Sequence, residues 1–272
     1  MKKSIFILLF AVGLLFVSCG SSSKDKAKED VQKQKSDIIV FAAASMEETL
    51  NMIKEKYELE NPDINIVYNF DSSGTLKTQI DEGAECDIFI SAAQKQMDAI
   101  DADKNSKSVP EFPIDSKTRI NLLENKVVLA VPKNNPAGVT GFEDLNTDKV
   151  KKIALGNSDV PVGQYSEEIL KNMGIWDKLQ SKISFGTNVK EVTAWVAENA
   201  ADCGIVYSTD AFSAGLEAVS APPEGSLKTP VIYPAAILAG SKHKDNASQF
   251  LKYLQSEEAA GIFKSVGFEP VK

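Results

Sequence analysis

Two hydrophobic periodicities alternate along residues 37–100, and this alternation constrains the fold more than any other feature of the chain. Apolar or alternating runs at 37–41, 64–70 and 87–90 are typical of β-strands, and each precedes apolar residues at helical spacing. The residues that share one face of the first helix are Met46, Leu50, Ile53 and Tyr57. Strands that alternate with helices indicate an α/β fold with a parallel sheet and helices on both faces.

The same alternation begins again after residues 101–118, a polar stretch with two prolines that is expected to be a surface loop. Further strands are expected at 126–131, 152–156, 204–207 and 231–239, and further helices at 164–173, 189–200 and 248–264. The two halves echo each other, since each has a cysteine at the entry to a strand, Cys86 or Cys203. We therefore predict two similar α/β lobes with parallel sheets. Residues 37–122 plus 230–272 would form lobe 1, and residues 123–229 would form lobe 2.

The first twenty residues have the pattern of a signal peptide. Two lysines precede an apolar run from Ile5 to Val17, which is too short to span a bilayer, and Ser18, Cys19 and Gly20 follow. This ending resembles a bacterial lipobox, in which the cysteine receives lipid and becomes the new N-terminus, although Phe16 departs from the commoner leucine. Residues 1–18 are accordingly predicted to be a signal peptide and Cys19 a lipidation site. The alternative is plain secretion, with Cys19 inside the removed peptide.

Residues 19–36 are predicted to be the lipidated cysteine and a flexible tether. Residues 20–36 are rich in Ser, Lys, Glu, Asp and Gln and contain almost no apolar side chains. A lipid, a tether and a globular body describe an extracytoplasmic protein anchored to the cell membrane. No other segment of the sequence is long and apolar enough to cross a membrane.

Composition argues against several classes of function. The 30 basic and 38 acidic residues give a net charge of −8, which loss of Lys2 and Lys3 with the signal peptide would make −10, whereas a nucleic-acid partner requires a basic surface. His243 is the only histidine and Arg119 the only arginine, so a histidine metal cluster or an arginine clamp has few candidate residues. A serine-dependent enzyme has no Gly-x-Ser-x-Gly motif to support it.

Hydroxyl groups gather where predicted strands end and helices begin. In parallel α/β sheets, ligands bind at these junctions because helix N-termini carry partial positive charge. The junctions lie at 41–48, 70–76, 160–164, 187–190 and 206–210, and Lys190 is their only cation. Taken alone, Ser45 is explained as a helix N-cap, with Glu48 completing a capping box. Taken together, the junctions indicate a dry anion site built from neutral donors.

Such a site favours a fully deprotonated dianion. A protonated anion needs an acceptor for its proton, and without one it leaves an unpaired polar group at a cost of about 1–3 kcal/mol. The predicted donors therefore select an oxyanion of the molybdate or sulfate type over hydrogen phosphate, provided that Asp71 points away from the site.

The chain resembles the molybdate-binding proteins of ABC transporters from about Ile38 to Phe268. The segments that carry the resemblance are Phe-Ala-Ala-Ala-Ser at 41–45, Ser-Ser-Gly-Thr-Leu at 72–76, Asp-Ile-Phe-Ile-Ser-Ala at 87–92, Val-Pro-Val-Gly-Gln-Tyr at 160–165, Gly-Ile-Val-Tyr at 204–207 and Ile-Phe-Lys-Ser-Val-Gly-Phe at 262–268. The resemblance implies the type II periplasmic-binding-protein fold, with two lobes joined by a hinge and the ligand in the cleft between them.

The resemblance also assigns the ligand and its contacts. It implies molybdate, and tungstate of similar size and charge, with no cofactor and no direct cation site. The serine ligands of the family fall on Ser45 and Ser73, its backbone-amide contacts on Val162 and Val189, and its tyrosine hydroxyl on Tyr207. Two positions depart from the family pattern: Gly74 stands where serine is common, and Val162 where alanine is common.

The expected role is that of a monomeric receptor whose lobes close on the anion and deliver it to an ABC permease. The alternatives are another oxyanion such as sulfate, a small organic anion on the same scaffold or, more remotely, a serine-dependent hydrolase. Cys86 and Cys203 are expected to be separate buried thiols, because a disulfide between the lobes would oppose the hinge motion.

Overall fold

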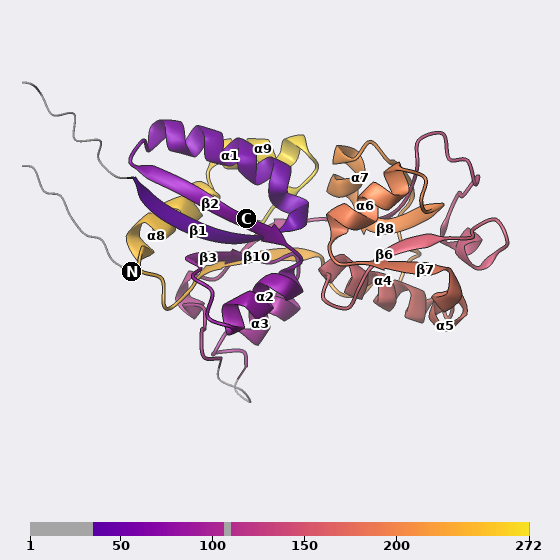
Figure 1. Cartoon of the computed structure of the whole chain (residues 1–272), viewed down its shortest axis with the longest axis horizontal. Coiled ribbons are helices and arrows are strands. Elements are labelled where there is room, and N and C mark those ends of the chain that lie inside the picture. Colours follow the sequence, from indigo (N-terminus) through magenta and orange to yellow (C-terminus); the bar gives the residue numbers. More distant parts are fainter. Residues whose placement is uncertain (1–34, 106–109, 272) are drawn as a thin grey trace, which may run out of the picture. The chain divides into compact units, whose positions relative to one another are not determined.

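The computed structural model describes residues 35–105 and 110–271 (Figure 1). The predicted signal peptide, the lipidation site Cys19 and the tether up to residue 34 lie outside the described residues. The described strands form two separate sheets with helices packed on both, which confirms the two-lobed α/β fold.

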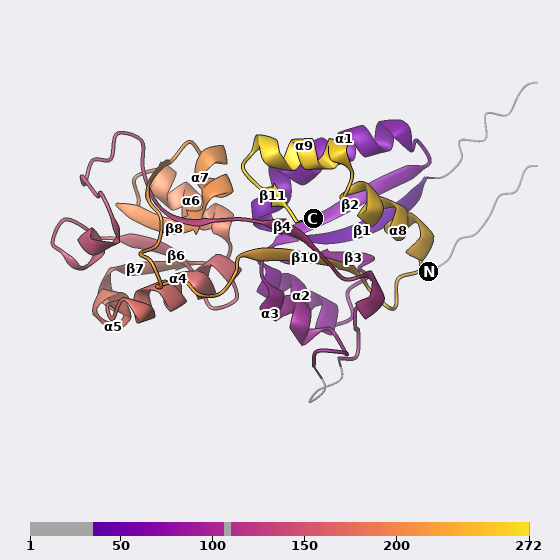
Figure 2. The ribbon, with the colours of Figure 1, turned by 180° about the vertical axis from the view of Figure 1, so that it is seen from behind.

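The first sheet has six strands in the order β11-β4-β10-β3-β1-β2. Their bounds are β1 (Ser36–Ala43), β2 (Ile64–Asp71), β3 (Ile88–Ile90), β4 (Ile120–Glu124), β10 (Ile232–Ile237) and β11 (Glu269–Pro270). Helices α1 (Glu47–Glu60) and α9 (Glu257–Ser265) cover one face, and α2 (Ser73–Asp81) and α3 (Gln94–Ala99) cover the other (Figures 1 and 2). A short 3-10 turn, η1 (Ala44–Met46), joins β1 to α1, and α8 (Lys244–Tyr253) packs on β10.

The second sheet has five strands in the order β7-β6-β8-β5-β9. Their bounds are β5 (Val127–Val131), β6 (Ile153–Gly156), β7 (Ile183–Gly186), β8 (Cys203–Tyr207) and β9 (Glu217–Ser220). Helices α6 (Val189–Ala197) and α7 (Ser208–Ser213) lie on one face, and α4 (Pro161–Asn172) and α5 (Trp176–Leu179) on the other (Figure 1). The chain passes between the sheets after β4 and again before β10, while the lobe boundaries at residues 122 and 229 stay a prediction.

The expectation of parallel sheets is wrong, because both sheets are mixed. β1 runs parallel to β2 and β3, and β6 runs parallel to β7 and β8. In contrast, β10 and β5 run antiparallel to their neighbours. Each of these two strands is the first strand along the sequence after the chain crosses from the other lobe. It therefore enters its sheet from the end where the parallel strands finish, without the helical crossover that a parallel connection needs.

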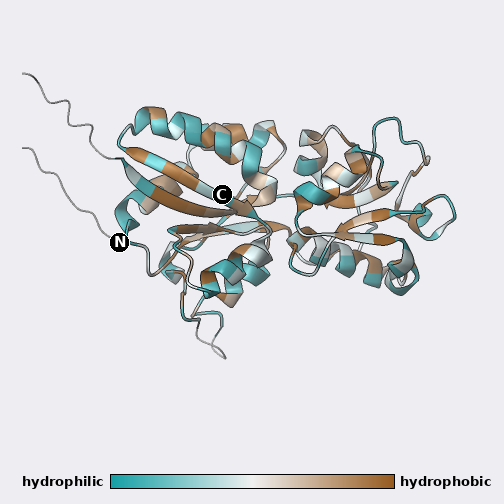
Figure 3. Cartoon of the chain, in the orientation of Figure 1, coloured by the Kyte–Doolittle hydropathy of each residue, from teal (hydrophilic) through white to brown (hydrophobic). Residues whose placement is uncertain are grey.

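Burial explains why periodicity identified the central strands. Every residue of β3, β6 and β8 is buried, so these strands read as continuous apolar runs. Figure 3 shows the hydrophobic residues concentrated on the strands and on the inner sides of the helices. The helix expected at 164–173 corresponds to α4, and Gly174, with φ of 70°, follows its end as glycine often does at a helix C-terminus. Short strands with mixed polarity, such as β7 and β9, lack such a signal and were missed.

Cys86 and Cys203 are free and buried, as expected. Cys86 lies just before β3 and Cys203 begins β8, and each of these strands is the third of its sheet when counted from the edge strand β2 or β7. Burial raises the pKa of the Cys203 thiol to about 12. Within residues 35–105 and 110–271, no helix combines the length and the apolar character that crossing a membrane requires.

Candidate functional site

The ends of several strands and the beginnings of several helices meet around one small cavity. Its wall comes from the last residues of β1, β2 and β8 and from the first residues of η1, α2 and α6, together with the residues at the start of α4. The cavity has a volume of about 10 Å³, which is the space of about one water molecule. Both lobes contribute, so the cavity lies where the sequence placed the anion site. Four of the five predicted ligand residues line it: Ser45, Ser73, Val189 and Tyr207.

Ser45 does not cap a helix, contrary to its simplest interpretation. The turn η1 begins one residue earlier with Ala43 as its N-cap, and α1 then begins after Met46 with no side-chain cap. Ser45 therefore lies inside the turn, and its Oγ is 2.9 Å from the hydroxyl of Tyr233. Because the hydroxyl is not engaged by a helix terminus, it remains available to a ligand in the cavity.

At the junction between β2 and α2, helix capping and the predicted ligand contact fall on two different serines. Ser72 is the N-cap of α2, and its Oγ accepts a hydrogen bond of 3.1 Å from the amide of Thr75. Ser73 is the first helical residue, is fully buried, and its Oγ accepts a hydrogen bond of 2.9 Å from the amide of Ala92. The hydroxyl proton of Ser73 is then the donor that this side chain can offer to an anion.

Asp71 also lines the cavity, at the end of β2. Its Oδ1 accepts a hydrogen bond of 2.7 Å from the amide of Ser72, so one carboxylate oxygen is turned back toward the chain. A carboxylate on the wall still opposes a nearby dianion, because like charges repel most strongly where water is excluded.

The two predicted amide donors differ in position. Val189 is the first residue of α6 and lies on the wall, behind the N-cap Asn188. Val162 is the second residue of α4 and is fully buried; Val160 and Pro161 line the cavity in its place. Both amides belong to first helical turns, whose N–H groups have no acceptor within their own helix. Each can therefore point an N–H group and the positive end of a helix dipole toward an anion.

Tyr207 ends β8 and is 1% exposed. Burial, together with neighbouring tyrosines and Asp210, raises the pKa of its phenol well above 10, so the hydroxyl stays protonated and can donate. The acceptor it contacts is the backbone oxygen of Ala92 at 3.4 Å, which is long for an O–H···O bond. An anionic oxygen in the cavity would be a stronger acceptor for the same proton.

Three polar residues behind the wall were not predicted. The hydroxyl of Tyr233 on β10 sits between Ser45 Oγ at 2.9 Å and Asn125 Nδ2 at 3.2 Å. The hydroxyl of Tyr165 on α4 approaches the backbone oxygens of Pro230 at 3.3 Å and Ala92 at 3.5 Å. In the sequence, Tyr233 is one aromatic residue within an apolar strand and Asn125 is one amide residue between two strands. No sequence pattern indicated that either residue would lie near a binding site. Tyr165 lies within the segment 160–165, which carries the family resemblance.

The two lobes touch next to the cavity through backbone atoms. The amide of Gly74, the second residue of α2, donates a hydrogen bond of 3.0 Å to the backbone oxygen of Asp159, which precedes α4. A Cβ atom at Gly74 would lie 2.3 Å from that oxygen. This chain therefore departs from the family at a position where any side chain would obstruct contact between the lobes.

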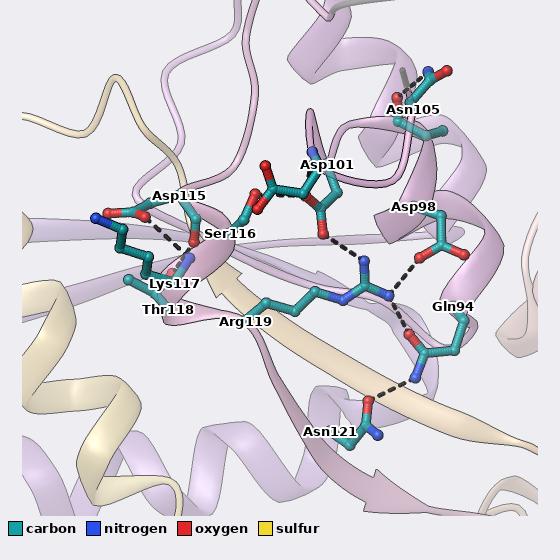
Figure 4. Close-up of polar contacts among 12 residues, drawn as sticks. Gln94, Asp98, Asp101, Asn105, Asp115, Ser116, Lys117, Thr118, Arg119 and Asn121 are labelled. Carbon is teal, nitrogen blue, oxygen red and sulfur yellow. Dashed lines mark hydrogen bonds and ion pairs between the residues drawn. The ribbon is translucent and has the colours of Figure 1, made fainter. Parts of the chain in front are cut away.

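Apart from Asp71, the side chains that line the wall are uncharged. None of the described residues that line the cavity is Lys, Arg or His. Arg119 instead holds the loop after α3 in place, as Figure 4 shows: its guanidinium binds Asp98 at 2.6 Å and Asp101 at 2.7 Å and also reaches Gln94. Although burial opposes it, the hydrogen bonds from Ser116 and Arg119 lower the pKa of Asp101 below its usual range. Arg119 is thus a structural residue of lobe 1.

Together the wall offers hydroxyl and amide donors, helix N-termini and no cationic side chain. Such a set can hold a small anion without chemical change to it. A tetrahedral oxyanion needs more room than one water molecule, so its entry requires the wall to move apart. A cavity formed by two lobes can open in this way by hinge motion.

Comparison with known proteins agrees with this arrangement. Residues 38–269 match the family described as bacterial extracellular solute-binding protein. The chain is 36% identical to the molybdate-binding protein ModA of Haemophilus influenzae over 273 residues, covering 98% of this chain and 99% of the relative. It is also 36% identical over 268 residues to YvgL of Bacillus subtilis, named as an ABC transporter substrate-binding lipoprotein, with 98% of both chains covered. The solved periplasmic molybdate-binding protein of Azotobacter vinelandii shares the fold, with a TM-score of 0.74 at 24% identity, covering 86% of this chain and 100% of the other.

The fold and the cavity define a binding protein that takes its ligand between two lobes. The chain belongs to the bacterial extracellular solute-binding proteins. This membership confirms the expected class, an extracytoplasmic receptor for a solute and not an enzyme.

Proposed function

We propose that this protein binds molybdate, and tungstate in the same manner, in the cavity between its lobes and delivers the anion to an ABC permease. The observation that carries the proposal is the convergence of Ser45, Ser73, Val189 and Tyr207 from both lobes on a cavity whose wall has no cation. The relatives named as molybdate-binding proteins match nearly the whole chain, which supports the same ligand class here.

The donor set explains why a dianion of this type fits. The hydroxyls of Ser45, Ser73 and Tyr207 and the amides of Val162 and Val189 come from five separate junctions, so they can surround a tetrahedral ligand. Hydrogen bonds to a charged acceptor contribute about 1.5–3 kcal/mol each, which compensates for stripping the anion of water. Contacts from both lobes to the same anion would favour the closed form over the open one.

A thermal-shift panel on the purified full-length protein tests the ligand. Molybdate, tungstate, sulfate, phosphate and buffer are compared at matched ionic strength. We expect a large rise in melting temperature with molybdate and tungstate, because a ligand at a hundred times its Kd stabilises the folded state by about 2.7 kcal/mol. A rise with sulfate or phosphate alone would replace the ligand, and no rise with any oxyanion would refute the site.

Variants at the wall locate the binding. Ser45→Ala and Ser73→Ala each remove one donor and should weaken molybdate binding by about 1.5–3 kcal/mol, roughly 10- to 150-fold. Ser265→Ala is the matched control, because Ser265 is an exposed residue of α9 whose hydroxyl donates a hydrogen bond of 2.7 Å to the backbone oxygen of Ile262. Unchanged affinity in both wall variants would contradict the assignment.

We further propose that Cys19 carries lipid and holds the protein at the outer face of the membrane as a monomer. A receptor tethered near its permease has a raised effective concentration there. Mass spectrometry of the mature protein should show a lipid-modified N-terminal Cys19, and Cys19→Ser should release the protein from the membrane fraction. A mature N-terminus beyond Cys19 would instead indicate plain secretion.

A further inference from the structure

A buried carboxylate lies next to the anion cavity and takes no part in the proposed binding. Asp210 is the third residue of α7 and is 1% exposed. Within the part of the chain that the structure describes, no group donates a hydrogen bond to either of its carboxylate oxygens. Buried carboxylates are ordinarily hydrogen-bonded or paired, since leaving one unpartnered is strongly unfavourable. This arrangement therefore calls for an explanation.

The lysine next to Asp210 also lies close to a carboxylate of the other lobe. Lys190 Nζ on α6 lies 3.8 Å from Asp210 Oδ1, too far for a hydrogen bond, and 3.6 Å from Glu48 Oε1 on α1 of lobe 1. Glu48 is exposed and Lys190 is part-exposed, whereas the side chain of Asp210 is fully enclosed. One lysine thus faces two carboxylates, one buried in its own lobe and one on the opposite lobe.

Burial makes the neutral form of Asp210 accessible near neutral pH. It raises the pKa of this carboxyl to about 7; Lys190 acts in the opposite direction and Glu48 adds to the increase. The remaining titratable groups that interact with Asp210 are the phenols of Tyr207 on β8 and Tyr233 on β10. Both phenols have a pKa well above 10, so Asp210 is the group of this cluster that titrates near pH 7.

The cluster is continuous with the cavity. Tyr207 lines the wall, Tyr233 contacts Ser45, and Lys190 directly follows Val189. The negative charge of Asp210 is felt at both tyrosines, because it helps to raise the pKa of each. A dianion held by Tyr207 and Val189 would experience the same charge. Ionised Asp210 and a bound dianion therefore oppose each other across a buried, low-dielectric region.

We propose that the anion binds together with one proton, which Asp210 takes up, so that Lys190 is left to pair with Glu48 across the lobes and to balance the bound anion. This inference rests on the proposed function for the anion itself. The proton comes from the solvent and forms an O–H bond on the Asp210 carboxylate, and no other bond changes. Neutralisation removes the opposing charge and at the same time frees the lysine for its contact with the opposite lobe.

Proton uptake makes affinity depend on pH in a defined direction. Below about pH 7 Asp210 is already neutral in the free protein, and the Kd should be constant. Above that pH the proton must be acquired on binding, so the Kd should rise by up to about tenfold per pH unit, reaching up to about 100-fold at pH 9. Molybdate keeps its two charges over this range, so the dependence reports on the protein.

Calorimetric titration of the full-length protein with molybdate tests the proposal. The Kd is measured from pH 6 to pH 9 at constant ionic strength, in pairs of buffers with different heats of ionisation, which yields the number of protons taken up. We expect uptake that approaches one proton per anion at pH 8–9 and vanishes at pH 6. A Kd independent of pH, with no proton uptake, would overturn the inference while leaving the proposed function intact. No binding at any pH would refute the proposed function, and the inference with it.

Two variants assign the proton to Asp210. Asp210→Asn keeps the shape and removes the titration, so it should bind molybdate at pH 9 nearly as tightly as at pH 6 and take up no proton. Asp144→Asn is the matched control, because Asp144 is another buried aspartate of lobe 2, paired instead with Lys149 at 2.7 Å. It should keep the pH dependence of the parent protein. Unaltered pH dependence in Asp210→Asn would overturn the assignment.

A third variant keeps the proposal testable if Asp210→Asn fails to fold. Lys190→Gln removes the cation that lowers the pKa of Asp210. The pH above which affinity declines should then move upward, while proton uptake persists. A midpoint that stays in place or moves downward would overturn the proposed pairing.

Discussion

Replacement of Gly74 by alanine should separate the stability of the protein from its affinity for the ligand. The Cβ introduced by Gly74→Ala would lie 2.3 Å from the backbone oxygen of Asp159 and 2.8 Å from its Cβ. Contacts of Cβ atoms below 3.0 Å essentially do not occur, so the lobes must move apart by at least about 0.7 Å at this point. Because the obstructing atom belongs to the backbone, no change of rotamer relieves the clash.

The two consequences of Gly74→Ala have opposite signs. Within α2, alanine is a better helix former than glycine, which stabilises the ligand-free protein by about 0.5–1 kcal/mol where the lobes are free to separate. Closure loses the hydrogen bond from the Gly74 amide, worth about 1 kcal/mol, and incurs steric strain of about 1–3 kcal/mol. We therefore expect molybdate affinity to fall by about 2–4 kcal/mol, roughly 30- to 1,000-fold.

Calorimetry gives the Kd and thermal unfolding without ligand gives the stability. Gly261→Ala is the matched control, because Gly261 also lies within a helix, α9, and a Cβ there meets no atom within 4 Å. The control should gain stability and keep its affinity. If Gly74→Ala binds molybdate as tightly as the parent protein, the contact between Gly74 and Asp159 does not belong to the bound state and the reasoning is refuted.

Three further predictions concern charged residues. Asp71→Asn removes a negative charge from the wall while its Oδ1 can still accept from Ser72, so molybdate affinity should rise by about 1 kcal/mol, roughly fivefold; calorimetry showing weaker binding would contradict this. Between about pH 4 and pH 7 the folded protein holds a proton on Asp210 more tightly than the unfolded chain does. Its contribution to stability should therefore fall as pH rises through that window, by up to about 4 kcal/mol; urea unfolding of the parent and of Asp210→Asn should show the difference, and parallel pH profiles would count against it. Arg119→Lys should lower the unfolding free energy by about 1–3 kcal/mol, because lysine cannot bridge Asp98 and Asp101 at once, yet leave the Kd unchanged; a weakened Kd would show that the network acts on the site.

The sequence predicted the parts of the fold that depend on local pattern. The spacing of apolar residues predicts buried strands such as β3 and β8 and amphipathic helices such as α1 and α4. This spacing can be read from consecutive residues alone. The direction of β5 and β10 could not be read in this way, because it depends on the side from which the chain re-enters each sheet. Both strands are mostly apolar, and this pattern would be the same whichever way the strand ran in its sheet.

The sequence likewise predicted some residues of the candidate site and missed others. The strand–helix junctions indicated the segments that could bind a ligand, because ligands bind where strands end. The family resemblance then assigned the individual residues within them, and Ser45, Ser73, Val189 and Tyr207 line one cavity. Whether a given serine caps a helix or faces a ligand depends on where the helix begins to within one residue, a margin at which sequence patterns fail. Ser45 and Ser72 show this, since Ser72 caps a helix and Ser45 does not. Asp210 gave no signal, because its significance arises only from the absence of hydrogen-bonding neighbours among the described residues in three dimensions.

Locating tungsten by anomalous X-ray scattering in crystals grown with tungstate tests the central claim most directly. We expect a single peak in the cavity, with tungstate oxygens within hydrogen-bond distance of Ser45 Oγ, Ser73 Oγ, the Tyr207 hydroxyl and the amides of Val162 and Val189. A strong peak elsewhere on the protein, or no peak in crystals grown at saturating tungstate, would contradict the account.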